Sequence, residues 1–133
     1  MSSVRSLVAV LLGLAFISIG IQHFLNPLAF DAIVPVYLGW PRFWTLASGV
    51  LEISLGGGLL FSRSRSLSAY LLVLLVLMMS LANLNMWLND IPFNGTRLST
   101  TGHIVRWTLQ LILLFALSWL GGNPRAVFTR TSS

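Results

Sequence analysis

Four apolar segments of membrane-spanning length restrict this chain to a narrow class of folds. They are residues 7–25, 44–61, 67–88 and 103–120. Each is close to the ~20 residues that cross about 30 Å of hydrocarbon as a helix. Only 8% of the residues are charged, against about 25% in an average soluble domain. The sequence therefore predicts an all-α membrane protein, with one bundle of four transmembrane helices over residues 1–121 and a polar cytoplasmic tail at 122–133.

The first segment follows Arg5 and has to be distinguished from a cleavable signal peptide. Its apolar run continues through Ile21 to His23 and Phe24, beyond the length of a signal-peptide core, and it has no small-residue cleavage site there. We therefore expect this segment to be retained as the first transmembrane helix.

The basic residues predict how the bundle is oriented. All eight are arginines. Those expected at the end that carries both termini are Arg5, Arg63, Arg65, Arg125 and Arg130. The opposite end has Arg42 and Arg97, which Asp31 and Asp90 offset. The positive-inside rule then places both termini in the cytoplasm, with the chain in the inner (cell) membrane.

Composition also excludes some classes of function. The net charge of +5 is not gathered on one helix face with interleaved aromatic residues, so we expect the lipid bilayer and no nucleic acid as a partner. The chain has no cysteine, which excludes disulfides, thiol redox chemistry and thiolate metal ligands within it.

The first long loop predicts a short interfacial helix between the first and second spans. Asn26 and Pro27 are typical of a helix start and Pro35 of its end, so we expect a helix over 27–33. The aromatic residues around this helix suit the membrane interface. They are Phe30, Tyr37, Trp40, Phe43 and Trp44. Two interpretations remain open: a lid across the end of the bundle, or an anchor with no gating role.

In the second long loop, Asn94, Gly95 and Thr96 fit both a glycosylation pattern and a tight turn, and we favour the turn.

Glu52, the only glutamate, lies near the middle of the second span. A charged group at that depth costs roughly 2.5 kcal/mol or more, so it must face protein or water and find a partner. Small and polar residues share its helix face at spacings of three and four. They are Thr45, Ser48, Gly49 and Gly56. The first span carries a similar stripe, which consists of Ala9, Gly13, Phe16, Gly20 and His23. We expect these small faces to pack against neighbouring helices.

Polar residues on the four spans predict a pocket that opens toward the end with the longer loops. Its expected lining is His23, Glu52, Asn83, Arg106 and Gln110. The leading hypothesis is an ion pair between Glu52 and Arg106, supported by Gln110 and Asn83. The alternative is that these side chains only fix helix packing, with Arg106 extended toward the interface.

His23 and His103 are residues of the type that binds haem or a metal ion. Metal sites usually need more ligands than two, so we expect hydrogen-bonded histidines and no metal site. No motif identifies catalytic residues, which stay unknown.

Taken together, these motifs resemble the DoxX family of small four-helix membrane proteins. The residues that carry the resemblance are Gly20-Ile21-Gln22-His23-Phe24, Pro27, Phe30, Ile33, Pro35, Ser48-Gly49-Val50-Leu51-Glu52, Asn83-Leu84-Asn85-Met86, Arg106 and Gln110. The similarity runs from about Val4 to Leu120 and lies in the joint order of the motifs. The family takes its name from the small membrane subunit of a thiosulfate:quinone oxidoreductase, and relatives are linked to membrane redox systems.

The resemblance implies an accessory subunit of a membrane redox or respiratory system, whose polar pocket binds a quinone-like molecule and whose partners are membrane oxidoreductase subunits. With no cofactor ligand set, electron transfer would need a partner or a bound cofactor. One alternative is a non-enzymatic membrane scaffold or assembly factor. A weaker one is a small permease, for which a four-helix chain would have to form a homo-oligomer.

Overall fold

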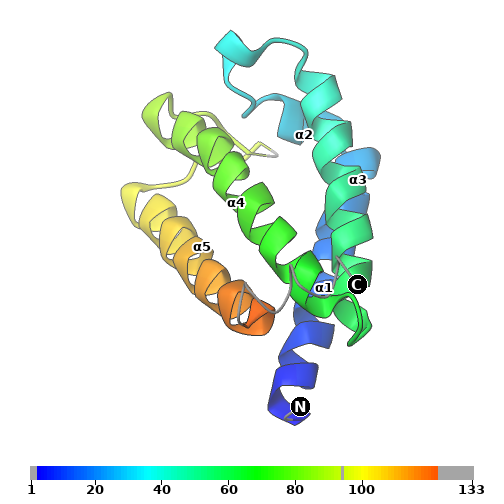
Figure 1. Ribbon diagram of the computed structural model, residues 1–133. Helices are drawn as coiled ribbons and strands as arrows, with labels where there is room; N and C mark the ends of the chain where they lie inside the picture. The colour runs from blue at the N-terminus through cyan, green and yellow to red at the C-terminus, as the bar shows by residue number, and fades with distance from the viewer. Residues whose placement is uncertain (1–2, 94, 123–133) are drawn as a thin grey trace.

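The protein is an all-helical bundle in a computed structural model that describes residues 3–93 and 95–122 (Figure 1). Its elements are α1 (Ser3–Leu25), α2 (Pro27–Asp31), the short 3-10 helix η1 (Val36–Leu38), α3 (Pro41–Leu60), α4 (Arg65–Leu88) and α5 (Thr100–Gly121). Within the described residues, the four long helices are long and apolar enough to cross a bilayer. The predicted fold class is confirmed: the chain is a multi-pass helical membrane protein with a short helix between its first two spans.

All four long helices begin before the apolar segments do. α3 begins at Pro41 rather than Trp44, and α5 at Thr100 rather than His103. The apolar segment marks only the part of a helix that suits lipid, whereas backbone hydrogen bonding continues through polar residues to the cap. At α5 the cap is Ser99, whose hydroxyl accepts a hydrogen bond from the Gly102 amide at 3.2 Å.

The small-residue faces of α1 and α3 pack against each other, as predicted. The buried residues of α1 are the five of the predicted stripe. A Cβ built on Gly13 would lie 2.7 Å from the Gly56 carbonyl oxygen, and one on Gly20 would lie 2.8 Å from the Gly49 carbonyl oxygen. The two backbones therefore meet closely at two levels, where only glycine fits.

The four long helices form two pairs, α1 with α3 and α4 with α5, which meet mainly where α3 packs on α4 (Figure 1). We call the end where α1 begins and α5 finishes the terminal end, and the opposite end the loop end. A buried apolar cluster that includes Leu59, Leu72 and Leu117 joins the pairs toward the terminal end. There Arg5 donates hydrogen bonds to the carbonyls of Trp119 and Leu120, at 3.0 and 2.8 Å. Cations at helix C-termini stabilise the exposed carbonyls.

The first long loop differs from its prediction in detail. α2 ends at Asp31 instead of Ile33, and the Asn26 side chain makes no capping hydrogen bond. After Asp31 the backbone continues in tighter turns, in which the Ile33 and Val34 amides donate to the carbonyls three residues before them, at 3.2 and 3.3 Å. Pro35 follows, and a proline disfavours helical backbone at the residue before it.

The two interpretations of the first long loop, a lid and an interfacial anchor, each fit a different part of it. Phe30 and Ile33 line the cavity described below, as a cover would. Tyr37 and Trp40 are 77% and 78% exposed, as interfacial anchors would be.

The second long loop makes the tight turn that we favoured. Phe93 and Thr96 exchange both backbone hydrogen bonds at 3.0 Å, and Gly95 between them has a φ of +82°. Asn94, the residue on which the glycosylation pattern depends, lies outside the described residues, as does the predicted tail beyond Gly122.

Candidate functional site

A cavity of about 540 Å³ lies between the two helix pairs, toward the loop end. This volume is within the range of about 300–1,000 Å³ that small-molecule sites occupy. Its polar lining residues are Gln22, Asn26, Glu52, Asn83, Arg106 and Gln110. The rest of the lining is apolar and includes Phe16, Phe30, Val76 and Leu113. An apolar hollow with a few convergent polar groups is the usual form of a ligand site.

Glu52 is paired with a histidine of the neighbouring helix. Glu52 Oε2 lies 3.1 Å from His23 Nε2, and the two residues are only 1% and 2% exposed. The atoms are close enough for an ion pair but are not aligned as a hydrogen bond, and neither has another hydrogen-bond partner among the described residues. The buried carboxylate of Glu52 thus has one partner, on α1.

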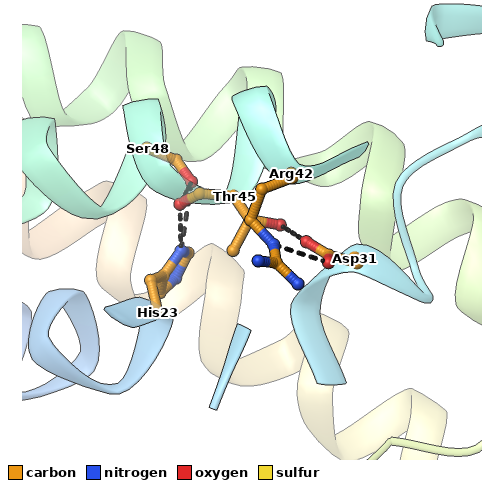
Figure 2. Close-up of polar contacts among 5 residues, drawn as sticks. All are labelled: His23, Asp31, Arg42, Thr45 and Ser48. Atoms are coloured by element: carbon orange, nitrogen blue, oxygen red, sulfur yellow. Dashed lines mark hydrogen bonds and ion pairs between the residues drawn. The ribbon is translucent and has the colours of Figure 1, made fainter. Parts of the chain in front are cut away.

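The other ring nitrogen of His23 fixes how many protons this pair holds. His23 Nδ1 lies 2.8 Å from the Thr45 carbonyl oxygen and 3.2 Å from Ser48 Oγ (Figure 2). A carbonyl oxygen only accepts, so Nδ1 carries a hydrogen. The 3.1 Å approach of His23 Nε2 to Glu52 Oε2 then favours one further proton on one of these two atoms, because two facing lone pairs would repel each other. Whether the nitrogen or the oxygen holds that proton, the pair has no net charge.

A second set of polar contacts joins α4 and α5 on the other side of the cavity. Arg106 Nη2 donates to Asn83 Oδ1 at 2.6 Å, and Asn83 Nδ2 donates to Gln110 Oε1 at 2.5 Å. Gln110 Nε2 donates to the Ser80 hydroxyl, which in turn donates to the Val76 carbonyl at 3.1 Å. The donors all run in one direction along this chain of contacts, which fixes the orientation of both amides.

The predicted ion pair between Glu52 and Arg106 is wrong. The carboxylate belongs to the α1–α3 pair and contacts His23, whereas the guanidinium belongs to the α4–α5 pair and contacts Asn83. Because the close glycine contacts hold α1 against α3, the charged side chain next to Glu52 is His23 of α1. Both groups nevertheless line the same cavity, from different helix pairs.

Of the five predicted pocket residues, the structure brings four to the cavity lining. Those four are Glu52, Asn83, Arg106 and Gln110. His23 is not in the lining. It lies against Glu52, and its ring stacks on the lining residue Phe30 with 3.8 Å between ring centroids. His103 is buried at another place, where its ring stacks on the Trp87 ring with 5.4 Å between the ring centroids.

The sequence interpretation missed Gln22 and Asn26 as cavity residues. Gln22 lies on α1 and Asn26 directly follows its last residue. The Asn26 amide still donates to the Gln22 carbonyl at 2.8 Å, so the two residues share a face next to the small-residue stripe. Neither residue belongs to the stripe, so the stripe does not indicate them. The signal that does indicate them is a pair of polar residues at a spacing of four on another face of the first span.

The sequence indicates Asp31 only as a charge that offsets an arginine. In the structure its carboxylate also connects α2 to α3 beside the cavity. Its carboxylate accepts hydrogen bonds from Thr45 Oγ1 at 2.6 Å and from Arg42 Nε at 2.9 Å (Figure 2). Thr45 thus uses its hydroxyl to hold the end of α2 and its carbonyl to orient His23. α2 and His23 are therefore linked through one residue of α3, and His23 in turn contacts Glu52.

The surroundings of His23 leave neither of its ring nitrogens for a metal or haem. In the part of the chain that the structure describes, no group of three or more His, Cys, Asp or Glu residues could hold a metal ion. Both ring nitrogens of His23 already face protein acceptors, so neither is turned toward an external ligand.

Comparison with known proteins identifies the family of this chain. A family model described as a domain of unknown function, DUF8561, matches residues 12–120. The chain belongs to this family. The DUF8561 range contains the polar cavity residues and nearly all of the four long helices. No curated protein and no solved structure matches the sequence. The family description names no activity, so the function of this DUF8561 protein has to be inferred from its cavity.

Proposed function

We propose that this protein is a DoxX-like accessory subunit of a membrane redox system, and that its cavity binds a quinone-like amphiphile. The observation that carries the proposal is the cavity itself, where an apolar lining meets polar groups from all four long helices. A small amphiphile needs both kinds of surface, one for its head group and one for its tail.

The arrangement of the helices favours a ligand that enters from the lipid. α1 packs chiefly on α3 and α5 on α4, and α1 and α5 hardly touch except near the terminal end. Ile19 of α1 and Leu109 of α5 both line the cavity and are 44% and 59% exposed. An apolar tail would lie between these two helices, with the head group beside Arg106 and Gln110.

The His23–Glu52 pair supports a role in proton exchange. Reduction of a quinone to a quinol takes up two electrons and two protons. The pair holds one proton next to the cavity lining, at Glu52. In this proposal, Glu52 supplies one of the two protons to a ligand oxygen, the second proton reaches the other ligand oxygen from solvent, and both electrons come from a partner oxidoreductase.

Binding of decylubiquinone to the purified protein in lipid nanodiscs tests the proposal. We expect saturable binding that Leu113→Trp weakens about tenfold or more, because the larger side chain fills the apolar part of the cavity. Ile112→Trp is the matched control. This neighbouring residue is 58% exposed and does not line the cavity, so its replacement should leave binding unchanged. Non-saturable binding, or equal effects of the two variants, would refute the proposal.

One observation favours the alternative of a scaffold or assembly factor. The contacts from Arg106 through Asn83 and Gln110 to Ser80 fix the register of α4 on α5 without any ligand. A scaffold would still copurify with its partner from native membrane, and it would show no saturable quinone binding.

We also propose that both termini face the cytoplasm and that the chain resides in the inner membrane. The support is charge: the terminal end carries Arg5, Arg63 and Arg65, whereas Arg42 and Arg97 at the loop end are each paired with an aspartate at 2.9 and 2.8 Å.

Single cysteines test this orientation, since the chain has none of its own. In intact cells, an impermeant maleimide should label Tyr37→Cys at the loop end and should label Ser62→Cys only after permeabilisation. The reverse pattern would invert the proposed topology.

A further inference from the structure

We infer that the ligand of this cavity carries an anionic oxygen head group on its apolar tail. The inference deepens the proposed function, since it depends on the cavity being a ligand site. It follows from the distribution of charge among the described residues, which leaves one guanidinium in the lining with no negative partner.

All three acidic side chains of the chain are already paired. Glu52 lies 3.1 Å from His23, Asp31 lies 2.9 Å from Arg42, and Asp90 lies 2.8 Å from Arg97. None of these carboxylates is within ion-pair distance of Arg106.

Arg106 has only neutral partners in the described part of the chain. Its one hydrogen bond there is to Asn83 Oδ1 at 2.6 Å, and its guanidinium carbon lies 5.8 Å from the centroid of the Phe93 ring. A guanidinium has five N–H donors in a fixed plane, so most of them remain for a ligand. Arg106 lines the cavity together with Asn83 and Gln110.

No other lining group offsets this charge. Glu52 is the only acidic residue in the lining, and it shares one proton with His23 in a pair without net charge. Gln22, Asn26, Asn83 and Gln110 are neutral. The lining therefore carries a net charge of about +1 at the half-buried Arg106, which favours an anion over a neutral head group.

The planar donor fork of arginine suits an oxygen anion with two acceptors. A carboxylate, a phosphate or the enolate of a hydroxyquinone all present such oxygens. Among these anions, the volume and apolar lining of the cavity favour those that are attached to a hydrocarbon tail.

The experiment compares matched amphiphiles on the full chain in nanodiscs of zwitterionic phosphatidylcholine. The probes are a dodecyl hydroxynaphthoquinone that is ionised at neutral pH, its uncharged methyl ether, and dodecyl phosphate. Isothermal titration calorimetry measures their affinities. We expect the ionised quinone to bind about tenfold or more tightly than its methyl ether, since a hydrogen bond to a charged group is worth more than a neutral one.

Variants of Arg106 and Arg97 assign the preference to one residue. Arg106→Gln should abolish the difference between the two quinones, and Arg106→Lys should keep part of it. The control is Arg97→Gln, which removes an exposed arginine paired with Asp90 and should leave the difference intact. If Arg106→Gln does not fold, the wild-type comparison together with Arg106→Lys still decides.

The outcomes separate this inference from the proposed function. If the two quinones bind equally well, quinone binding stands and the anion inference is overturned. If only dodecyl phosphate binds and the binding depends on Arg106, the anion inference stands and the quinone proposal falls. If no probe binds, both fall. Retention of phosphatidylglycerol by the wild type and not by Arg106→Gln, seen by native mass spectrometry, would identify the anion as a bilayer lipid rather than a free amphiphile.

Discussion

A methyl group added at Gly56 is expected to lower the free energy of unfolding by about 2 kcal/mol or more, whereas the same change at Gly57 should not lower it. A Cβ on Gly56 would lie 2.8 Å from the Gly13 carbonyl oxygen and 3.0 Å from Phe16 Cβ. The oxygen belongs to the backbone, so only a separation of α1 from α3 could relieve the contact. That separation would also loosen the second contact level, at Gly20 and Gly49.

Gly57 is the matched control because a Cβ there has no atom within 4 Å. Alanine is the better helix former by up to about 1 kcal/mol, so Gly57→Ala should be neutral or slightly stabilising. Unfolding of both variants by sodium dodecyl sulfate in mixed micelles, followed by circular dichroism, provides the measurement. Similar stabilities for the two variants would contradict the close approach of α1 and α3.

Removal of either member of the His23–Glu52 pair is expected to destabilise the bundle by about 3 kcal/mol or more. The cost arises because the remaining polar group stays buried without its partner. Glu52→Gln should be much milder than Glu52→Ala, since a glutamine amide can donate to His23 Nε2 in place of the shared proton. The same unfolding assay measures both variants.

A double-mutant cycle distinguishes this pair from the ion pair that the sequence suggested. His23→Ala combined with Glu52→Ala should cost less than the sum of the single changes, by about 1 kcal/mol or more. Glu52→Ala combined with Arg106→Ala should be additive to within about 0.5 kcal/mol, because those two side chains share no contact. Coupling of Glu52 to Arg106 and not to His23 would contradict the geometry of the site.

The features that follow from helical spacing could be predicted from the sequence. The stripe from Ala9 to His23 is the buried face of α1, and the face of Glu52 and Gly56 is buried on α3. Spacings of three and four place residues on one face whatever the neighbouring helix is. The fold class was predictable for a similar reason, because the length of an apolar helix is matched to the bilayer.

The partner of Glu52 could not be predicted in this way. It depends on which helices are neighbours and on how closely their axes approach, and both depend on the glycine contacts between α1 and α3. The sequence favoured Arg106, because this arginine is long enough to reach inward and the pairing would give each buried charge a partner. In the structure the partner of Glu52 is the nearer side chain, His23 on the adjacent helix.

Asp31 was missed for the same physical reason. Its contacts with Arg42 and Thr45 bridge a short helix and a long one across a loop. Local spacing in the sequence carries no information about such a bridge. The role of this loop in positioning the cavity thus became visible only with the fold.

The hydrogen bond from Arg5 to the Leu120 carbonyl joins residues 115 positions apart. During synthesis Leu120 is added after the first three spans are complete. The hydrogen bond from Arg5 can therefore form only once the fourth span has followed the first into the membrane. A chain interrupted before α5 would lack both this hydrogen bond and the part of the cavity wall that carries Arg106. Formation of the cavity is therefore tied to the synthesis of the fourth span.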